Sequence, residues 1–269
     1  MDLNGYSGYV RSVPGILSFM KDKHRTGGNF SVFRGAGLLL SWLLAVPAAS
    51  QAETAGFRCG EDMRDARDGK TYQTVLIGGQ CWMKQNLDVG MMLEAGSPLQ
   101  PGLPVSQADE ITKYCYEDDP ANCEVYGGLY TWEQAMGSGL IEAYGDVCPP
   151  GWHLPSKEEW EALASFLGRE DAGQKIKASP EDPYPWDGTN ESGFSGLPAG
   201  AGNGEGYQRL GQWALFWSSS EADGQRAWFA QLDGFWYEQP PKYKIIYIGN
   251  YYLKSNLFSV RCLKDSQQK

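Results

Sequence analysis

Residues 148–160, with the sequence CPPGWHLPSKEEW, contain the clearest helix signal of the chain. Ser156 is followed three residues later by Glu159, a spacing typical of the capping box that opens a helix. The apolar residues of one helical face then follow in order: Trp160, Leu163 and Leu167. Gly168 comes directly after them and favours the end of a helix. The stretch therefore predicts a short amphipathic helix that presents a tryptophan to the core.

One further helix is indicated upstream of this stretch. Thr131 is followed three residues later by Gln134, so a second capping box is expected there. Gly137 limits this helix to little more than one turn. The sequence thus predicts two helices, both short.

Short strands account for most of the remaining pattern. The runs TYQTVLI (71–77) and QCWMKQNL (80–87) are separated by two glycines and predict a hairpin. Further strands are expected at 215–221, 227–232, 244–248 and 258–265. The segments 88–113 and 179–206 are rich in Gly, Pro or Ser and indicate long loops. Two short helices among short antiparallel strands predict an α+β fold.

Composition sets outer limits on function. The chain has 269 residues, of which 42% are hydrophobic and 21% are charged, as expected for a globular protein of one or two domains. Its formal net charge is −10, which would repel a polyanion. We therefore expect no binding to nucleic acid.

Residues 1–52 predict a cleaved signal peptide. Basic residues precede the apolar run GAGLLLSWLLAV (35–46), which is shorter than the roughly twenty residues of a membrane-spanning helix. Ser50-Gln51-Ala52 has the small residues of a cleavage site, and Met20 is an alternative start. We expect a secreted, periplasmic or cell-surface protein that meets the membrane only during export. A loose segment (53–67) and a polar tail (266–269) would flank the folded domain.

All six cysteines lie after this leader, and their even number in an exported chain favours disulfides. Six cysteines allow 15 pairings. Spacing favours three pairs: Cys59 with Cys81, Cys115 with Cys123, and Cys148 with Cys262. A zinc site is disfavoured because the chain has no Cys-x-x-Cys pair and keeps one histidine, His153, after the leader.

Five segments, in the same order, resemble the Fibrobacter succinogenes major paralogous domain family of exported bacterial proteins. They are DGKTYQTVLIGGQCWMKQNL (68–87), YCYEDDPANCEVYGGLYTWEQAM (114–136), CPPGWHLPSKEEW (148–160), GFSGLPAG (193–200), and LFWSSSE (215–221) with FSVRCLKD (258–265). The resemblance spans 68–265 as a single domain. It implies a C-type-lectin-like fold, distantly akin to the domain of formylglycine-generating enzymes, to which the cysteine count adds disulfide staples. It implies no particular activity.

The residues themselves indicate neither catalysis nor a metal site. His153 would have to serve any Ser-His-Asp arrangement, yet its place before a helix cap favours a packed residue that donates to backbone. Formylglycine generation needs a reactive cysteine pair near the C-terminal end, where this chain has only Cys262. The sugar-binding triplets of calcium-dependent lectins are absent, and the acids within 62–68 and 117–119 are expected to be solvated loop acids. We predict no catalytic residue, no metal and no cofactor.

Binding through exposed aromatic side chains is the remaining class of function. The candidates lie in Pro- and Gly-rich stretches: Tyr184, Trp186, Trp236 and Tyr237. The tryptophans inside the family segments are expected in the core: Trp82, Trp132, Trp152, Trp160 and Trp217. The predicted function is a non-catalytic recognition or adhesion module of the bacterial envelope that binds polysaccharide or an envelope protein. The alternatives are a structural envelope protein without a small ligand and an enzyme of unknown reaction.

Overall fold

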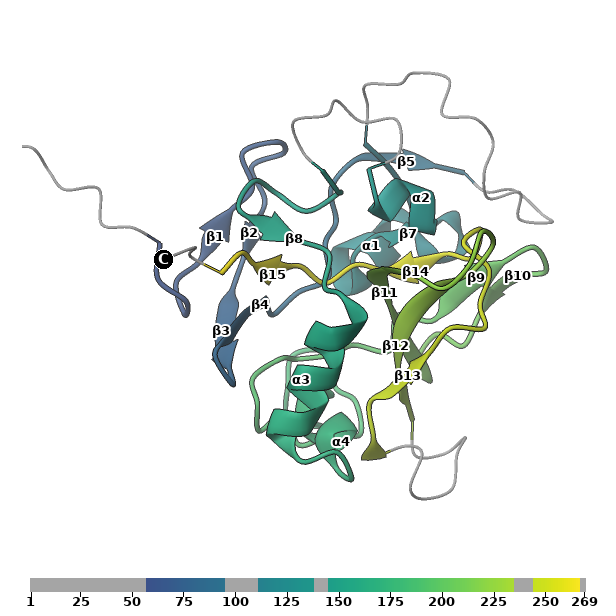
Figure 1. Cartoon of the computed structure of the whole chain (residues 1–269). Helices are drawn as coiled ribbons and strands as arrows, with labels where there is room; N and C mark the ends of the chain where they lie inside the picture. Colours follow the sequence, from purple (N-terminus) through teal and green to yellow (C-terminus); the bar gives the residue numbers. More distant parts are fainter. Residues whose placement is uncertain (1–56, 95–110, 138–144, 235–243, 267–269) are drawn as a thin grey trace, which may run out of the picture. The chain divides into compact units, whose positions relative to one another are not determined.

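The computed structural model describes residues 57–94, 111–137, 145–234 and 244–266 (Figure 1). The chain divides into two units, Met1–Glu53 and Thr54–Lys269, and every described residue lies in the second. Within these ranges, no helix has the length and apolar character needed to cross a membrane.

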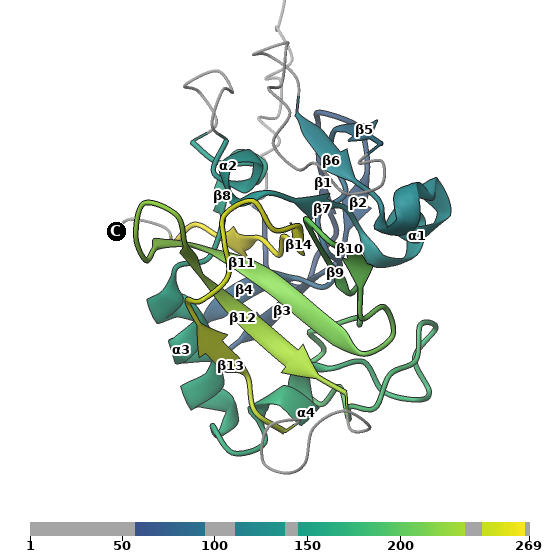
Figure 2. The same ribbon diagram turned by 90° about the vertical axis from the view of Figure 1, so that its right-hand side faces the viewer.

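The larger sheet has seven strands in the order β13-β12-β11-β14-β7-β6-β5. Their bounds are Tyr247–Gly249 (β13), Ala227–Asp233 (β12), Trp213–Glu221 (β11), Phe258–Ser259 (β14), Leu129–Tyr130 (β7), Thr112–Tyr114 (β6) and Met91–Leu93 (β5). The pairs β11–β14 and β5–β6 are parallel, and the other pairs are antiparallel. Figure 2 shows the long strands β11 and β12 side by side with the edge strand β13.

The second sheet has four antiparallel strands in the order β3-β4-β15-β8. Their bounds are Thr74–Ile77 (β3), Gln80–Met83 (β4), Leu263–Lys264 (β15) and Trp152–His153 (β8). The strands β3 and β4 form the predicted hairpin, since only Gly78 and Gly79 separate them. Two small pairs complete the strands: Met63–Arg64 (β1) with Thr71–Tyr72 (β2), and Ala201–Asn203 (β9) with Gly206–Gln208 (β10).

Four α-helices and one 3-10 turn accompany the sheets within the described residues. Their bounds are Tyr116–Asp118 (η1), Pro120–Tyr126 (α1), Trp132–Ala135 (α2), Lys157–Leu167 (α3) and Ala172–Ile176 (α4). Both predicted capping boxes are present, Thr131 with Gln134 on α2 and Ser156 with Glu159 on α3. Each box satisfies backbone donors that would otherwise be unpaired at the start of its helix.

The core forms on both faces of the central strand β11, because successive side chains of a strand point to opposite faces. Phe216 faces α3, where it contacts Trp160 with ring centroids 5.5 Å apart. Trp217 faces the opposite side of the sheet, and its ring centroid lies 4.3 Å from that of Phe258. Trp160, which the helix pattern predicted to face the core, is fully buried.

The structure confirms an α+β fold with three disulfides. The bonds join Cys59 to Cys81, Cys115 to Cys123 and Cys148 to Cys262, the same pairs that spacing favoured. None of the six cysteines remains free. Three disulfides are consistent with an extracellular or periplasmic protein.

The prediction of only two helices is wrong. The helix α1 was missed because its Asp119-Pro120 start resembles a turn, whereas Asp119 caps a helix by accepting from the N–H of Ala121. The helix α4 was missed because it is short and contains Gly173. That glycine is required by close packing, since a Cβ atom there would lie 2.3 Å from the carbonyl oxygen of Ile245.

Two predicted irregular segments also contain regular structure. The loop expected at 88–113 includes β5 and part of β6, a parallel pair that the sequence pattern did not mark. The segment expected to be loose at 53–67 includes β1 and one end of the Cys59–Cys81 bond. Strand pairing orders both segments, with a nearby partner for β1 and a partner about twenty residues away for β5.

Candidate functional site

An open cavity of about 730 Å³ lies among β2, the segment after β4, α1 and the loop 178–197. Its volume falls within the roughly 300–1,000 Å³ of small-ligand sites. Both polar and apolar side chains line it. The polar and charged ones are Lys70, Thr71, Gln73, Lys84, Gln85, Asn86, Asp88, Glu124, Asp182, Asn190 and Ser195, and the aromatic or apolar ones include Tyr72, Val125, Pro183, Tyr184 and Leu197. Three separate segments, within residues 70–88, 123–127 and 178–197, therefore build the cavity.

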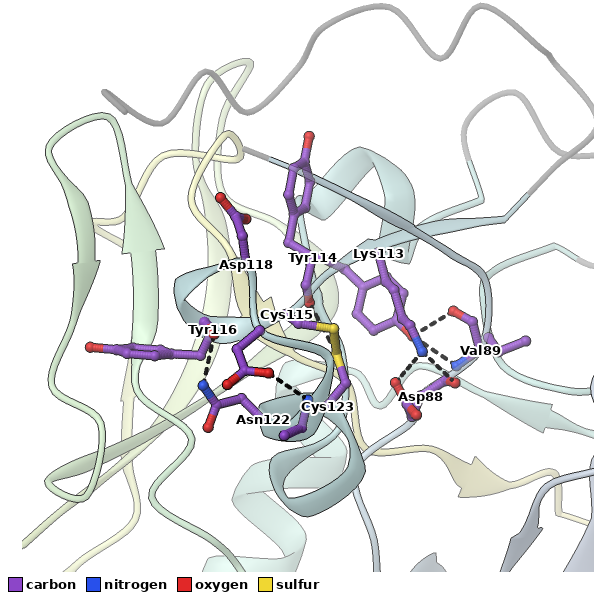
Figure 3. The surroundings of a disulfide bond; sticks show 12 residues. Asp88, Val89, Lys113, Tyr114, Cys115, Tyr116, Asp118, Asn122 and Cys123 are labelled. Atoms are coloured by element: carbon purple, nitrogen blue, oxygen red, sulfur yellow. Dashed lines mark hydrogen bonds and ion pairs between the residues drawn. A yellow bond between two sulfur atoms is a disulfide. The ribbon is translucent and has the colours of Figure 1, made fainter. Parts of the chain in front are cut away.

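One corner of the cavity holds two lysines on a single carboxylate. The ammonium groups of Lys70 and Lys113 both form ion pairs with Asp88. Figure 3 shows Lys113 reaching this residue from the strand β6. Burial lowers the pKa of Lys113, and the bond to Asp88 opposes that shift. Asp88 therefore has two cationic partners, of which Lys70 lines the cavity and Lys113 does not, and the carboxylate of Asp68 accepts from the N–H of Lys70 close by.

A third cation, Arg261, lies behind the cavity wall and is fully buried. Its Nε and Nη2 donate to the side-chain oxygen of Asn86 at 3.0 and 2.6 Å. Its Nη1 donates to the backbone carbonyls of Met83, Lys84 and Phe194. Burial lowers the pKa of Arg261 to about 9, so the guanidinium keeps its charge at neutral pH. No carboxylate of the described residues pairs with it.

The α1 side of the cavity is fixed by the Cys115–Cys123 disulfide, which ties the helix to the segment after β6 (Figure 3). Beside this bond, the amide of Asn122 donates to the carbonyl of Tyr116 at 2.8 Å. At the end of α1, Gly127 has φ +78°, and a Cβ atom there would lie 2.6 Å from the Asn86 side chain. Glycine at this position permits the helix end to approach the strand side of the cavity.

The loop 178–197 supplies the exposed ring of Tyr184, whose relative exposure is 48%. Asn190 and Ser195, in the same loop, adopt left-handed backbone with φ of 49° and 55°. The N–H of Ser195 donates to the side-chain oxygen of Asn190 at 2.9 Å, and the Asn190 amide donates to Ser195 Oγ at 3.0 Å. The same amide donates to Asp182 Oδ2 at 2.9 Å. These bonds hold a strained loop in one shape, a feature that clusters at ligand sites.

The structure separates the four aromatic residues proposed from sequence. Tyr184 lines the cavity. Trp186 is partly buried against the core cluster around α3, and the ammonium of Lys177 lies 5.1 Å from the centre of its ring. Trp236 and Tyr237 lie outside the described residues. Of the four, only Tyr184 is shown beside a cavity.

The tryptophans of the family segments lie in or against the core. Four of them are buried: Trp82, Trp152, Trp160 and Trp217. Trp132 is partly buried against the same core, and its Nε1 donates to the carbonyl of Ser218 at 2.9 Å.

His153 has carboxylate partners where sequence predicted backbone acceptors. Its Nε2 lies 3.0 Å from Glu159 Oε1, and its Nδ1 lies 2.7 Å from Asp265 Oδ1. The register of β8 against β15 pairs His153 with Leu263 and so brings Asp265 close. Hydrogen bonding to Glu159, ahead of the bond to Asp265, raises the pKa of His153 to about 9. The imidazolium joins the start of α3 to the C-terminal strand, a connection that no local pattern reveals.

Three of the acids weighed as calcium ligands have partners within the protein. Asp65 is fully buried and forms an ion pair with Arg67, whose Nη2 lies 2.6 Å from Asp65 Oδ2. The expectation of a solvated acid is therefore wrong for Asp65. Asp118 accepts from the hydroxyl of Tyr207 at 2.7 Å, and Asp119 caps α1. In the part of the chain that the structure describes, no group of three or more His, Cys, Asp or Glu residues is placed to hold a metal ion.

Fold and cavity together define a disulfide-linked α+β domain with a hollow of mixed polar and apolar lining among its described residues. The chain belongs to the Fibrobacter succinogenes major domain family, whose model matches residues 75–264. The matched region begins in β3 and ends in β15, so it includes the β3–β4 hairpin, α3 and the central strand β11. No curated protein and no solved structure matches the chain.

Proposed function

We propose that this protein is an exported, non-catalytic recognition module of the bacterial envelope that binds polysaccharide in the cavity beside Tyr184. We also propose that its fold is C-type-lectin-like, as the resemblance implies. The observation that carries the function is the meeting of an exposed aromatic ring with amide and charged side chains in one hollow. Export is supported by the three disulfides, which form and persist in oxidising compartments.

The chemistry of the cavity suits a sugar ring. A sugar offers an apolar face for an aromatic ring, together with hydroxyl groups that need donors and acceptors. Beside Tyr184, the cavity contains the amides of Gln73 and Gln85, each able to donate and to accept. Gln73 and Gln85 are exposed and already aligned, because the N–H of Gln73 donates to Gln85 Oε1 at 2.8 Å. A ligand would therefore meet a partly ordered polar surface.

The test is a glycan array followed by pull-down on insoluble polysaccharide, with wild type and two tyrosine variants. Tyr184→Ala is expected to weaken binding by about ten-fold, the magnitude measured for one stacking ring on a nucleic-acid base. Tyr251→Ala is the matched control, because Tyr251 is 49% exposed but does not line the cavity. It is expected to bind as wild type does.

Two results would contradict the proposal. If Tyr251→Ala loses binding and Tyr184→Ala keeps it, recognition lies away from the cavity. If wild type binds no polysaccharide on the array or in the pull-down, polysaccharide recognition itself is wrong.

A further inference from the structure

We infer that the cavity is selective for acidic sugars, with the ammonium of Lys84 contacting a carboxylate of the ligand. This inference rests on the proposed function and adds to it the chemical class of the sugar. It follows from an unequal distribution of charge around the cavity, described below wall by wall.

Lys84 is a half-buried cation on the cavity wall. Its backbone is fixed on both sides, since its N–H donates to the carbonyl of Gln73 at 2.8 Å and its carbonyl accepts from Arg261 at 2.8 Å. No carboxylate elsewhere in the described chain forms an ion pair with its ammonium group. A ligand carboxylate would supply this missing partner through a charge-assisted hydrogen bond.

The other cations of this wall strengthen its positive potential. Arg261 lies directly behind Lys84 and has no carboxylate partner among the described residues. Lys70 and Lys113 share the single carboxylate of Asp88. Asp68 lies close by, since its carboxylate accepts from the N–H of Lys70 at 2.9 Å, so four cations stand beside two acids on this side of the cavity. A local field of this kind attracts anions although the whole chain has a net charge of −10.

The acids of the facing segments reduce this field only in part. Glu124 is exposed on α1, so water and salt screen its charge. Asp182 is engaged within its own loop, where its Oδ2 accepts from the N–H of Ser179 at 2.6 Å and from the Asn190 amide. These bonds leave the charge of Asp182 in place, so the preference for an anion comes from Lys84 itself, whose ammonium forms no ion pair within the described residues. Tyr184 remains available for the ring of the sugar.

The experiment compares three uronic-acid polymers with their carboxyl-reduced forms, which keep the backbone and lose the charge. Polygalacturonate, alginate and hyaluronan are titrated calorimetrically into the intact protein at fixed ionic strength. We expect at least one acidic polymer to bind about ten-fold more tightly than its reduced form, the magnitude of one charge-assisted hydrogen bond. Lys84→Gln should abolish this preference, and Lys84→Arg should retain it.

Arg169→Gln is the matched control, because Arg169 is an exposed cation that does not line the cavity. It should leave the preference unchanged, and thermal denaturation should show that all three variants fold. Equal binding of acidic and reduced polymers, or an equal loss of both in Lys84→Gln, overturns the inference. In either case a selective loss in Tyr184→Ala still supports the proposed function. Failure of every polymer to bind, together with an empty glycan array, overturns both.

Discussion

Two parts of the molecule present a tyrosine of almost equal exposure in different surroundings. Tyr184 in the loop 178–197 is 48% exposed, and Tyr251 after β13 is 49% exposed. Tyr184 stands at a hollow that amides, three carboxylates and two lysines also line. Tyr251 instead belongs to a cluster of aromatic rings, with centroids 5.1 Å from Phe229, 4.5 Å from Tyr252 and 6.2 Å from Tyr247.

The difference shows that exposure alone does not identify a binding residue. The ring of Tyr251 already has aromatic contacts, and burial raises the pKa of its hydroxyl. The ring therefore belongs to a packed aromatic group with Phe229 of β12 and Tyr247 of β13. Figure 2 shows these two strands side by side. Tyr184 has polar groups around it that a ligand could contact. We expect Tyr251 to contribute to stability and Tyr184 to contribute to binding.

The largest effect should come from the arginine behind the cavity. Arg261→Met would leave the side-chain oxygen of Asn86 and three carbonyls without their donor. Unsatisfied buried acceptors of this kind should lower the free energy of unfolding by about 3–5 kcal/mol. Urea denaturation followed by tryptophan fluorescence measures the change. A loss below about 1 kcal/mol would show that Arg261 does not hold the cavity wall in place.

The comparison itself is tested by truncating each tyrosine and measuring stability. Tyr251→Ala should lower the free energy of unfolding by about 2 kcal/mol, because it removes several aromatic contacts worth about 0.5–1.5 kcal/mol each. Tyr184→Ala should change it by less than about 0.5 kcal/mol, as for an exposed side chain without such contacts. Thermal and urea denaturation of both variants provide the measurement. Equal losses in the two variants would contradict the distinction between the regions.

The smallest effect concerns His153, which lies in neither region. Its pKa of about 9 is above the ordinary value of 6.5, so the folded state binds the proton more tightly than the unfolded state. The stabilisation, about 1 kcal/mol after allowance for partial exposure, should be complete below pH 6.5 and disappear as the pH rises through 9. Urea denaturation of wild type and His153→Gln between pH 6 and 10 measures this difference.

The free energies of unfolding of wild type and His153→Gln should differ most at low pH and become equal at high pH. Polysaccharide binding at neutral pH should be the same in both, which would separate the cavity from a general loss of stability. A constant difference across the whole pH range would contradict the assigned pKa.

Local sequence predicted some elements well because their signals lie within a few residues. The two capping boxes and the Gly78-Gly79 turn were recognised in this way, and the structure contains all three. The helix α4 and the strand β5 gave no such signal. Their conformation depends on partners far along the chain, since Gly173 packs against Ile245 and Met91 pairs with Thr112.

Of the candidate site, the sequence identified Tyr184 but not its surroundings. Lys84 and Arg261 were not proposed as functional, because an isolated Lys or Arg has no distinctive local pattern. Their proposed role becomes visible only in the folded domain. There the segment between β14 and β15 places Arg261 behind the segment that follows β4. A contact between residues 84 and 261 involves the whole domain and is invisible to periodicity.

The sequence by itself therefore determined the composition of the core, the main capped helix, the α+β class and the family resemblance. These features depend on short-range spacing and on the number and chemistry of the residues. The tertiary structure alone decided which exposed tyrosine borders a cavity and which cation lacks a carboxylate partner. Both are properties of three-dimensional neighbourhood, because burial and charge balance depend on every segment that folds against a side chain.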